Sequence, residues 1–168
     1  MKMNSQVLVL DTTYVLPLFG ILPTLGNGFI EELKNMWENG LSGIEILLPD
    51  ICLLEVLYKL NGEYRKKNDL EILERYTITL PSIKHSQTVK IVDTYKDENI
   101  TILANKIRTA GHTDFFDCLI GASAINLEGI LITEDQPLKD KIRLIYDDKE
   151  NKMFSWKEFS HSRKKEKK

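Results

Sequence analysis

The sequence has few residues of the kinds that build disulfide frameworks or zinc sites. It contains two cysteines, Cys52 and Cys118, and three histidines in 168 residues. Both cysteines lie in apolar segments, where a buried, reduced thiol is the ordinary state in a cytosolic protein. No cysteine pair has metal-ligand spacing, which argues against a structural zinc ion. The fold must therefore depend on its hydrophobic core.

Long apolar runs and an excess of positive charge are also missing. The apolar runs are too short to cross a bilayer, and no signal-peptide pattern precedes the first strand-like segment. The net charge is −2, so any contact with nucleic acid must come from a local patch. We therefore expect a cytoplasmic protein that does not enter a membrane.

Short apolar segments alternate with longer segments of helical periodicity. The predicted strands are residues 6–10, 44–48, 88–92 and 129–133, with 143–146 as an edge strand. The predicted helices are residues 27–39, 50–64 (capped by Asp50), 69–76, 96–110 and 114–127, with one or two turns at 14–19. Residues 81–87 are expected to form a loop. This alternation is typical of a parallel α/β sheet, whose ligands bind at the carboxyl edge of the strands.

The length suits one domain, with a core large enough to fold without disulfides or structural metal. We assign residues 1–159 to this domain. The remaining residues, 160–168, read SHSRKKEKK and are expected to be a basic, disordered tail. Such a tail either keeps the protein soluble or contacts phosphate backbones.

Four acidic residues stand beside apolar runs. Asp11 ends VLVLD, Glu55 interrupts ICLLEVLYKL, Asp117 lies in FFDCLIGASAI, and Asp135 closes ILITED. An ionised carboxylate in apolar surroundings is costly unless it is paired or bound to a metal. Two of the four acids follow strands, and the other two lie on helices that begin at the same sheet edge. We therefore expect all four to converge on one point.

Each of these acids also has a purely structural interpretation. Asp11 can end its strand in an Asx turn, and Glu55 can pair with the lysine one helical turn later. Asp117 can take part in capping behind Asp114, and Asp135 can open a turn before a Gln-Pro pair. Four such coincidences are needed to explain every acid in this way, so we favour a functional cluster.

Four like charges close together repel each other unless cations lie between them. An oxygen-only set suits Mg²⁺ or Mn²⁺, which activate water and stabilise charge on a phosphate. Asp114 and Glu134 are close enough to compete for two of the roles. However, Asp114 suits a helix N-cap, and Glu134 should point to the opposite side from Asp135. Because no Ser-His-Asp, Cys-His or Gly-rich phosphate motif competes, the cluster predicts phosphoryl-transfer hydrolysis.

These segments resemble the PIN-domain family over residues 6–146. VLVLDTTYVL resembles the family's opening, an apolar strand followed by Asp-Thr-Ser/Thr. DCLIGASAINLEGILITED resembles its later motif, in which an Asp opens an apolar helix and a strand with Thr-x-Asp follows. Glu55 falls at the expected central glutamate. The resemblance implies a three-layer α/β/α fold with a five-stranded, mostly parallel sheet in the order 3-2-1-4-5.

The resemblance also implies an endoribonuclease that depends on Mg²⁺ or Mn²⁺, and we expect single-stranded RNA as its substrate. The implied catalytic metal ligands are Asp11, Glu55, Asp117 and Asp135. The implied supporting residues are Thr13, matching the small hydroxyl residue of the opening, Thr133, matching the Thr of Thr-x-Asp, and Asp114. Many small members are VapC-type toxins, which implies an antitoxin partner and a homodimer. Residues 20–43 and 68–87 are longer than a compact toxin needs.

Two alternatives stay open. A haloacid-dehalogenase-like phosphatase also begins with an Asp after a strand, but it needs a second acid where this chain has Thr13. Its late acidic pair after a glycine is also missing. A non-catalytic PIN-like module that binds RNA or a protein would not need the full set of acids. Metal-dependent cleavage of single-stranded RNA that is lost on Asp11→Asn separates these alternatives.

Overall fold

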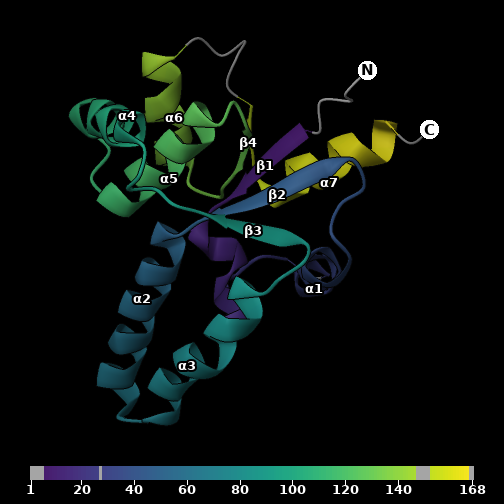
Figure 1. The fold of residues 1–168 in the computed structure, drawn as a ribbon, viewed down its shortest axis with the longest axis vertical. Helices are drawn as coiled ribbons and strands as arrows, with labels where there is room; N and C mark the ends of the chain where they lie inside the picture. Colours follow the sequence, from purple (N-terminus) through teal and green to yellow (C-terminus); the bar gives the residue numbers. More distant parts are fainter. Residues whose placement is uncertain (1–5, 27, 147–151, 167–168) are drawn as a thin grey trace.

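A computed structural model of the chain describes residues 6–26, 28–146 and 152–166. Its centre is a five-stranded sheet (Figure 1). The strands are β1 (Gln6–Leu10), β2 (Ile44–Pro49), β3 (Val89–Val92), β4 (Ile130–Ile132) and β5 (Met153–Phe154). They lie in the order β3-β2-β1-β4-β5, and every neighbouring pair is parallel. The predicted fold class and strand order are confirmed.

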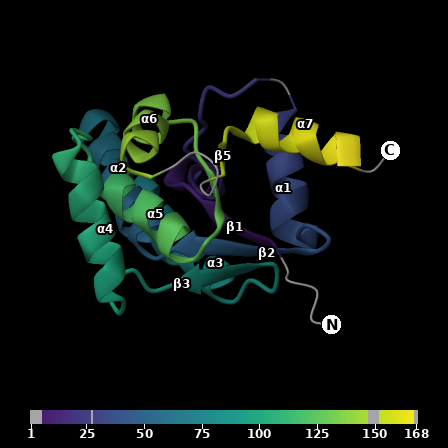
Figure 2. The same ribbon diagram turned by 90° about the horizontal axis from the view of Figure 1, so that it is seen from above.

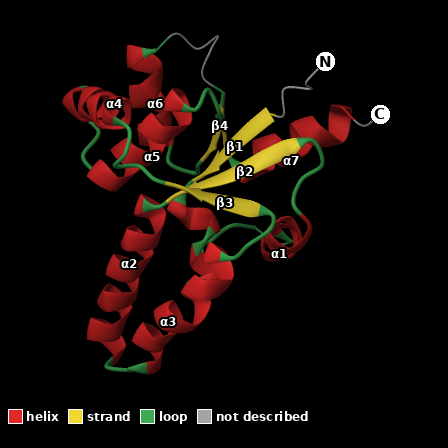
Figure 3. Cartoon of the chain, viewed as in Figure 1, coloured by secondary structure: helices red, strands yellow, loops and turns green. Residues whose placement is uncertain are grey.

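Helices cover both faces of this sheet. They are α1 (Phe29–Asn39), α2 (Ile51–Lys67), α3 (Glu71–Lys84), α4 (Glu98–Thr109), α5 (Phe115–Asn126), α6 (Gln136–Ile145) and α7 (Trp156–Glu166), with 3-10 turns η1 (Thr12–Tyr14) and η2 (Leu16–Phe19). Figure 2 shows α4, α5 and α6 on one side of the sheet and α1 and α7 on the other. The α2–α3 hairpin extends away from the sheet (Figure 3). None of the described helices is long and apolar enough to cross a membrane.

The core lies around β1 and α5. Residues 8–10 of β1 are completely buried, because the strand is paired on both sides and covered on both faces. Helix α5 is apolar around most of its surface, since it packs between the sheet and helices α4 and α6. A Cβ atom at Gly121 would lie 2.9 Å from Ile142 Cδ1, so glycine permits the close approach of α6. Cys52 and Cys118 are buried free thiols, as predicted.

The edge strand predicted at residues 143–146 is wrong. Residues 143–145 belong to α6, because Leu138 and Ile142, one helical turn apart, are both buried against the core. The edge strand is β5 instead. The backbone N–H groups of Leu131 and Thr133 donate to the carbonyls of Lys152 and Phe154, each at 2.9 Å.

Helix α3 is longer than predicted and contains Pro81. The loop expected over residues 81–87 is therefore mostly helix. Proline removes one hydrogen bond from a helix interior and clashes with the preceding turn. Both halves of α3 pack against the rest of the domain. Ile72 and Ile83 are buried, and Tyr76 stacks on Phe19 with ring centroids 5.6 Å apart. This packing compensates for the missing bond.

The start of α2 and the end of the domain differ from the predictions. Asp50 precedes α2 as predicted, but its side chain makes no cap hydrogen bond. Its Oδ1 accepts from the Thr94 backbone N–H at 3.0 Å and from the Thr94 hydroxyl at 2.5 Å, which ties α2 to the segment after β3.

At the other end of the chain, residues 160–166 continue α7, whose Trp156 and Phe159 are buried. The domain boundary predicted after residue 159 therefore falls inside a helix.

Candidate active site

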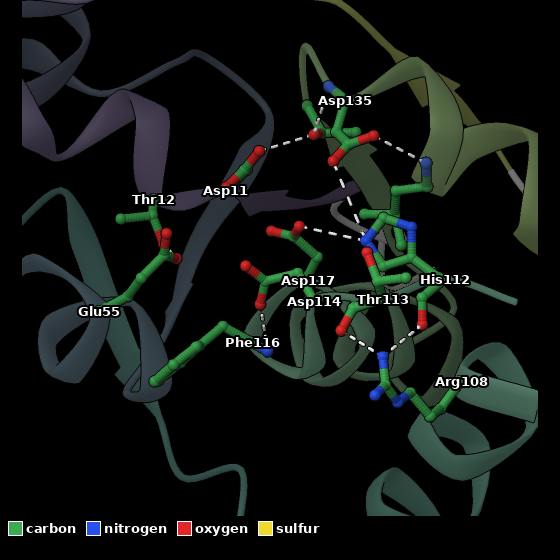
Figure 4. Close-up of polar contacts among 12 residues, drawn as sticks. Asp11, Thr12, Glu55, Arg108, His112, Thr113, Asp114, Phe116, Asp117 and Asp135 are labelled. Carbon is green, nitrogen blue, oxygen red and sulfur yellow. Dashed lines mark hydrogen bonds and ion pairs between the residues drawn. The ribbon is translucent and has the colours of Figure 1, made fainter. Parts of the chain in front are cut away.

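Buried polar residues gather where β1 and β4 end (Figure 4). Asp11 follows β1 directly, and its backbone N–H donates to the Ile132 carbonyl at 3.1 Å, which fixes it beside the end of β4. Glu55 lies one turn into α2, and Asp117 lies in the first turn of α5. Asp135 stands at the start of α6. Four separate elements thus deliver the four predicted acids to one edge of the sheet.

The acids form two overlapping groups rather than one. Carboxylate oxygens of Asp11, Glu55 and Asp117 lie within 4.8 Å of one another. Asp117 and Asp135 belong to a second group with His112, whose ligand atoms satisfy the same limit. Asp117 is shared by both groups. The structure thus brings the four acids to one edge of the sheet, in two groups that share Asp117 and not at the single predicted point. The role of these residues as metal ligands stays a prediction.

Thr133 connects the ends of β1 and β4 through its hydroxyl. Its Oγ1 donates to Asp11 Oδ2 at 2.6 Å and accepts from the Asp135 backbone N–H at 3.0 Å. Asp135 Oδ1 in turn accepts from the Leu138 N–H at 2.8 Å, which caps α6. Asp135 therefore has a structural role, although it caps a helix and does not open the predicted turn, and its second oxygen remains directed toward the cluster.

In η1 the hydroxyl that contacts a site acid belongs to Thr12 rather than Thr13. Thr12 Oγ1 donates to Glu55 Oε2 at 2.5 Å, because the 3-10 turn points the buried Thr12 side chain toward α2. Thr13 contributes its backbone N–H, which donates to the Asp11 carboxylate. Glu55 Oε1 also pairs with Lys59 Nζ at 2.9 Å, so the predicted helical ion pair exists beside the cluster.

Two further acids occupy the positions expected of them. Asp114 caps α5, because its Oδ1 accepts from the Phe116 N–H at 2.8 Å. Glu134 points away from the cluster, and its Oε1 accepts from the Tyr14 hydroxyl at 2.7 Å and from the Trp156 N–H at 2.9 Å. This geometry agrees with the reasons given above for preferring Asp117 and Asp135 to Asp114 and Glu134 as metal ligands.

Negative charge in the cluster is poorly compensated. Burial raises the pKa of Asp11 to about 7; the Thr133 hydrogen bond opposes this rise, and the Asp117 and Glu55 charges add to it. Burial likewise raises the pKa of Asp117 to about 7, with added repulsion from Asp114, Glu55 and Asp135. Without a bound cation, these two carboxyl groups therefore gain and lose their protons near neutral pH.

Sequence reasoning did not identify His112. The imidazole is only 6% exposed, and its Nε2 lies 3.1 Å from Asp117 Oδ2 and 3.9 Å from Asp135 Oδ2. The Arg108 guanidinium donates to the carbonyls of His112 and Thr113 and holds this segment in place. The sequence feature that could have indicated it is its position two residues before Asp114, the N-cap of the helix that carries Asp117.

An open groove of about 550 Å³ borders the cluster between α2 and the start of α5. Glu55 lies at the cluster end. Tyr58 and Phe115 line the groove with side chains that are 73% and 41% exposed. Two lysines, Lys59 and Lys66, lie along the same wall. Glu63 and Asp114 also line the groove, and Lys66 pairs with Glu63 at 3.2 Å. The groove therefore joins the acids to an exposed aromatic surface that carries charges of both signs.

Comparison with known proteins identifies the family. The family model described as PIN domain matches residues 8–144, and the chain therefore belongs to the PIN domain family. Comparison with curated proteins found no match. Similar solved structures share the fold at low sequence identity, and three of them are VapC-type or VapBC proteins.

VapBC2 from Rickettsia felis, solved with a DNA fragment from its promoter, has a TM-score of 0.57 and 17% identity, over 90% of this chain and 99% of that chain. VapBC-1 from nontypeable Haemophilus influenzae has a TM-score of 0.56 and 18% identity, over the same shares of the two chains. VapC20 from Mycobacterium tuberculosis, a toxin that cleaves the sarcin-ricin loop, has a TM-score of 0.54 and 14% identity, over 79% and 93%.

Proposed function

We propose that the protein is a divalent-metal-dependent endoribonuclease that hydrolyses phosphodiester bonds in RNA. The main support is the approach of the Asp11, Glu55 and Asp117 oxygens to within 4.8 Å, at the carboxyl edge of a PIN-domain sheet. These hard oxygen donors suit Mg²⁺ or Mn²⁺. Burial, and in second place the neighbouring carboxylates, raise the pKa values of Asp11 and Asp117, and a divalent cation would offset both effects. The residues therefore fit such an ion.

Asp11, Glu55 and Asp117 would hold the ion, with Asp135 beside them. When bound, it makes a coordinated water easier to deprotonate and stabilises negative charge on the phosphate. Thr12 and Thr133 each donate to one carboxylate oxygen and so fix the orientation of Glu55 and Asp11. Such outer hydrogen bonds commonly decide whether ligands stand in a productive geometry.

Lys59 has two roles in this proposal. In the free protein it pairs with Glu55 and offsets part of the cluster charge. Burial lowers its pKa, but the bond to Glu55 outweighs that effect, so the pKa is raised and the ammonium form is favoured. The side chain is 43% exposed and stands in the groove. A flexible ammonium there can turn to an incoming phosphate when Glu55 binds the ion.

The groove supports single-stranded RNA as the substrate. Exposed Tyr58 and Phe115 rings can stack on unpaired bases. Lys59 and Lys66 pair with Glu55 and Glu63 in the free protein and can turn from these acids to phosphates. A duplex hides its base faces and gains nothing from such rings. The open shape of the groove also suits a chain better than a small molecule.

Cleavage of a labelled single-stranded RNA tests the proposal. We expect activity with Mg²⁺ or Mn²⁺, loss of activity in excess EDTA, and a decrease of at least about 100-fold on Asp11→Asn, since one ligand is lost. Asp140→Asn is the matched control, because Asp140 lies on the exposed face of α6. Full activity in EDTA would contradict the metal mechanism. Binding without cleavage under every condition would favour the non-catalytic module.

A role as a VapC-type toxin with a protein antitoxin is a narrower proposal. It is favoured by the shared fold with two VapBC proteins and one VapC toxin over most of each chain. Induced expression in a bacterial host should arrest growth for the unaltered chain but not for Asp11→Asn. Normal growth with abundant, active protein would contradict the toxin role. We also propose the homodimer that the resemblance implies, and light scattering on the purified chain tests it.

A further inference from the structure

We infer that His112, Asp117 and Asp135 form a second metal site, which prefers a transition-metal ion to Mg²⁺. It deepens the proposed function and rests on it, because Asp117 would serve both this ion and the one beside Asp11 and Glu55. The distinguishing feature is a nitrogen donor. Within the described residues, the group containing Asp11 offers only oxygens, whereas this group offers an imidazole and two carboxylates.

The distances suit coordination. His112 Nε2 lies 3.1 Å from Asp117 Oδ2 and 3.9 Å from Asp135 Oδ2. Neighbouring ligands of an octahedral ion at about 2.1 Å stand roughly 3.0 Å apart, and opposite ligands about 4.2 Å apart. Both separations therefore lie within the span of one coordination sphere. A histidine that only donates a hydrogen bond to Asp117 would not need a second carboxylate facing the same nitrogen.

The three donors are also held in place. Asp135 Oδ1 is occupied by the Leu138 N–H, so Oδ2 is the oxygen that faces His112 (Figure 4). Arg108 fixes the carbonyls of His112 and Thr113. The His112 ring is buried with Nε2 directed at the acids rather than at solvent. Preorganised donors lose little conformational entropy when an ion binds.

The donor set decides which ion is preferred. Mg²⁺ takes oxygen ligands and keeps several waters, whereas imidazole suits first-row transition metals. Mn²⁺ accepts both kinds of ligand. We therefore expect two classes of Mn²⁺ in the protein. One, at Asp11 and Glu55, is displaced by Mg²⁺, and the other, at His112, resists displacement.

Pulsed electron paramagnetic resonance of the full chain loaded with Mn²⁺ tests the site directly, because coordinated imidazole produces ¹⁴N modulation. We expect this modulation in the unaltered protein and its persistence in excess Mg²⁺. His112→Gln should abolish it and weaken Mn²⁺ binding at this site by about 10- to 100-fold. Glutamine keeps a hydrogen-bond donor for Asp117, so a purely structural role of His112 would survive. His85→Gln, at an exposed histidine after α3, is the matched control and should change nothing.

Absence of ¹⁴N modulation in the unaltered protein, or modulation that persists in His112→Gln, would overturn the second site. If His112→Gln fails to fold, incorporation of ¹⁵N-histidine into the unaltered chain shows whether a histidine supplies the nitrogen, because the nitrogen signal must then change isotope. Among the described residues, His112 is the histidine grouped with these acids, and the same labelling of His85→Gln excludes His85. RNA cleavage separates this inference from the proposed function. If Mn²⁺ is bound to nitrogen but RNA is not cleaved, the second metal site is supported and the nuclease role is contradicted. If RNA is cleaved but Mn²⁺ is not bound to nitrogen, the nuclease role is supported and the second metal site is contradicted.

Discussion

Thr133 has more contacts with the cluster than its small size suggests. One hydroxyl both donates to Asp11 and accepts from the backbone of Asp135, so it sets the spacing between the two acids. It also opposes the rise in the pKa of Asp11 that burial causes. Removal of this hydroxyl should therefore disturb both stability and ligand geometry.

We expect Thr133→Val, which keeps the shape, to destabilise the fold by about 1–3 kcal/mol, because it leaves buried polar groups without partners. RNA cleavage should fall by about 10- to 100-fold, as for other residues that orient ligands. Thr133→Ser keeps the hydroxyl and should retain most of both properties. Urea unfolding and cleavage assays on the two variants measure this difference. Equal behaviour of valine and serine would show that the hydroxyl is unimportant.

The sequence identifies some site residues better than others, for local reasons. Asp11 and Asp135 follow buried strands, and Glu55 and Asp117 interrupt apolar helices, so each acid is conspicuous in its own segment. His112 is not conspicuous, because its approach to the acids depends on how Arg108 folds the segment before α5. Similarly, the resemblance favoured Thr13, but the rotation of the η1 turn directs the Thr12 side chain to Glu55.

Helices and strands could likewise be predicted where their own sequence determines them, and not where packing with distant segments does. The class of fold could be predicted, because alternating apolar strands and helices leave few other arrangements. Residues 143–146 were misassigned, since a short apolar run fits a strand or a buried helix equally well. Residues 81–87, which begin with Pro81, are predicted as a loop, although contacts made by α3 with η2, distant in sequence, keep the helix intact to Lys84. Such packing has no signature in the segment itself.

The α2 helix leads to a prediction at the scale of an element. Its Tyr58 lines the groove and is 73% exposed, so it carries little of the folding energy. We expect Tyr58→Ala to weaken binding of single-stranded RNA by about 1–3 kcal/mol, roughly the value of one base stacked on an aromatic ring. Unfolding should change by less than about 0.5 kcal/mol.

Tyr95→Ala is the control for this change, because Tyr95 is 72% exposed and does not line the groove. Fluorescence anisotropy with a labelled oligonucleotide, in EDTA to prevent cleavage, measures both variants. If the two tyrosines affect binding equally, RNA follows another path across the protein. An unchanged affinity in both would have the same consequence.

At the scale of the whole molecule, the cluster makes stability depend on pH. Asp11 and Asp117 have pKa values of about 7 in the folded protein, against an ordinary value of 3.8. Between these values the metal-free folded state binds more protons than the unfolded state, so stability falls as pH rises. The contribution is fully present below about pH 4 and is lost as pH passes through 7. The shift of Asp11 amounts to at most roughly 4 kcal/mol, since one pKa unit is worth about 1.4 kcal/mol. The shift of the more exposed Asp117 contributes less, because solvent screens its charge.

Asp11→Asn combines the pH effect with metal binding in one measurement. In metal-free protein at pH 8, asparagine keeps the size of the side chain but removes a charge that faces two other carboxylates. The variant should therefore be as stable as the unaltered chain, or more stable by about 1–3 kcal/mol. At pH 5 the difference should shrink, because Asp11 is then mostly protonated in the folded state.

Mg²⁺ should reverse this order at pH 8. A ligand that binds only the folded state stabilises it by RT ln(1 + [L]/Kd), about 1–3 kcal/mol at 10 to 100 times Kd. The unaltered chain and the Asp140→Asn control should gain this amount, and Asp11→Asn, which lacks a ligand, should gain much less. Urea unfolding of the three proteins with and without Mg²⁺ provides the test. Suppose that metal-free Asp11→Asn is clearly less stable at pH 8 and that Mg²⁺ shifts all three proteins equally. Asp11 would then be a residue that accepts hydrogen bonds to end a strand, and the proposed nuclease would lose its first ligand.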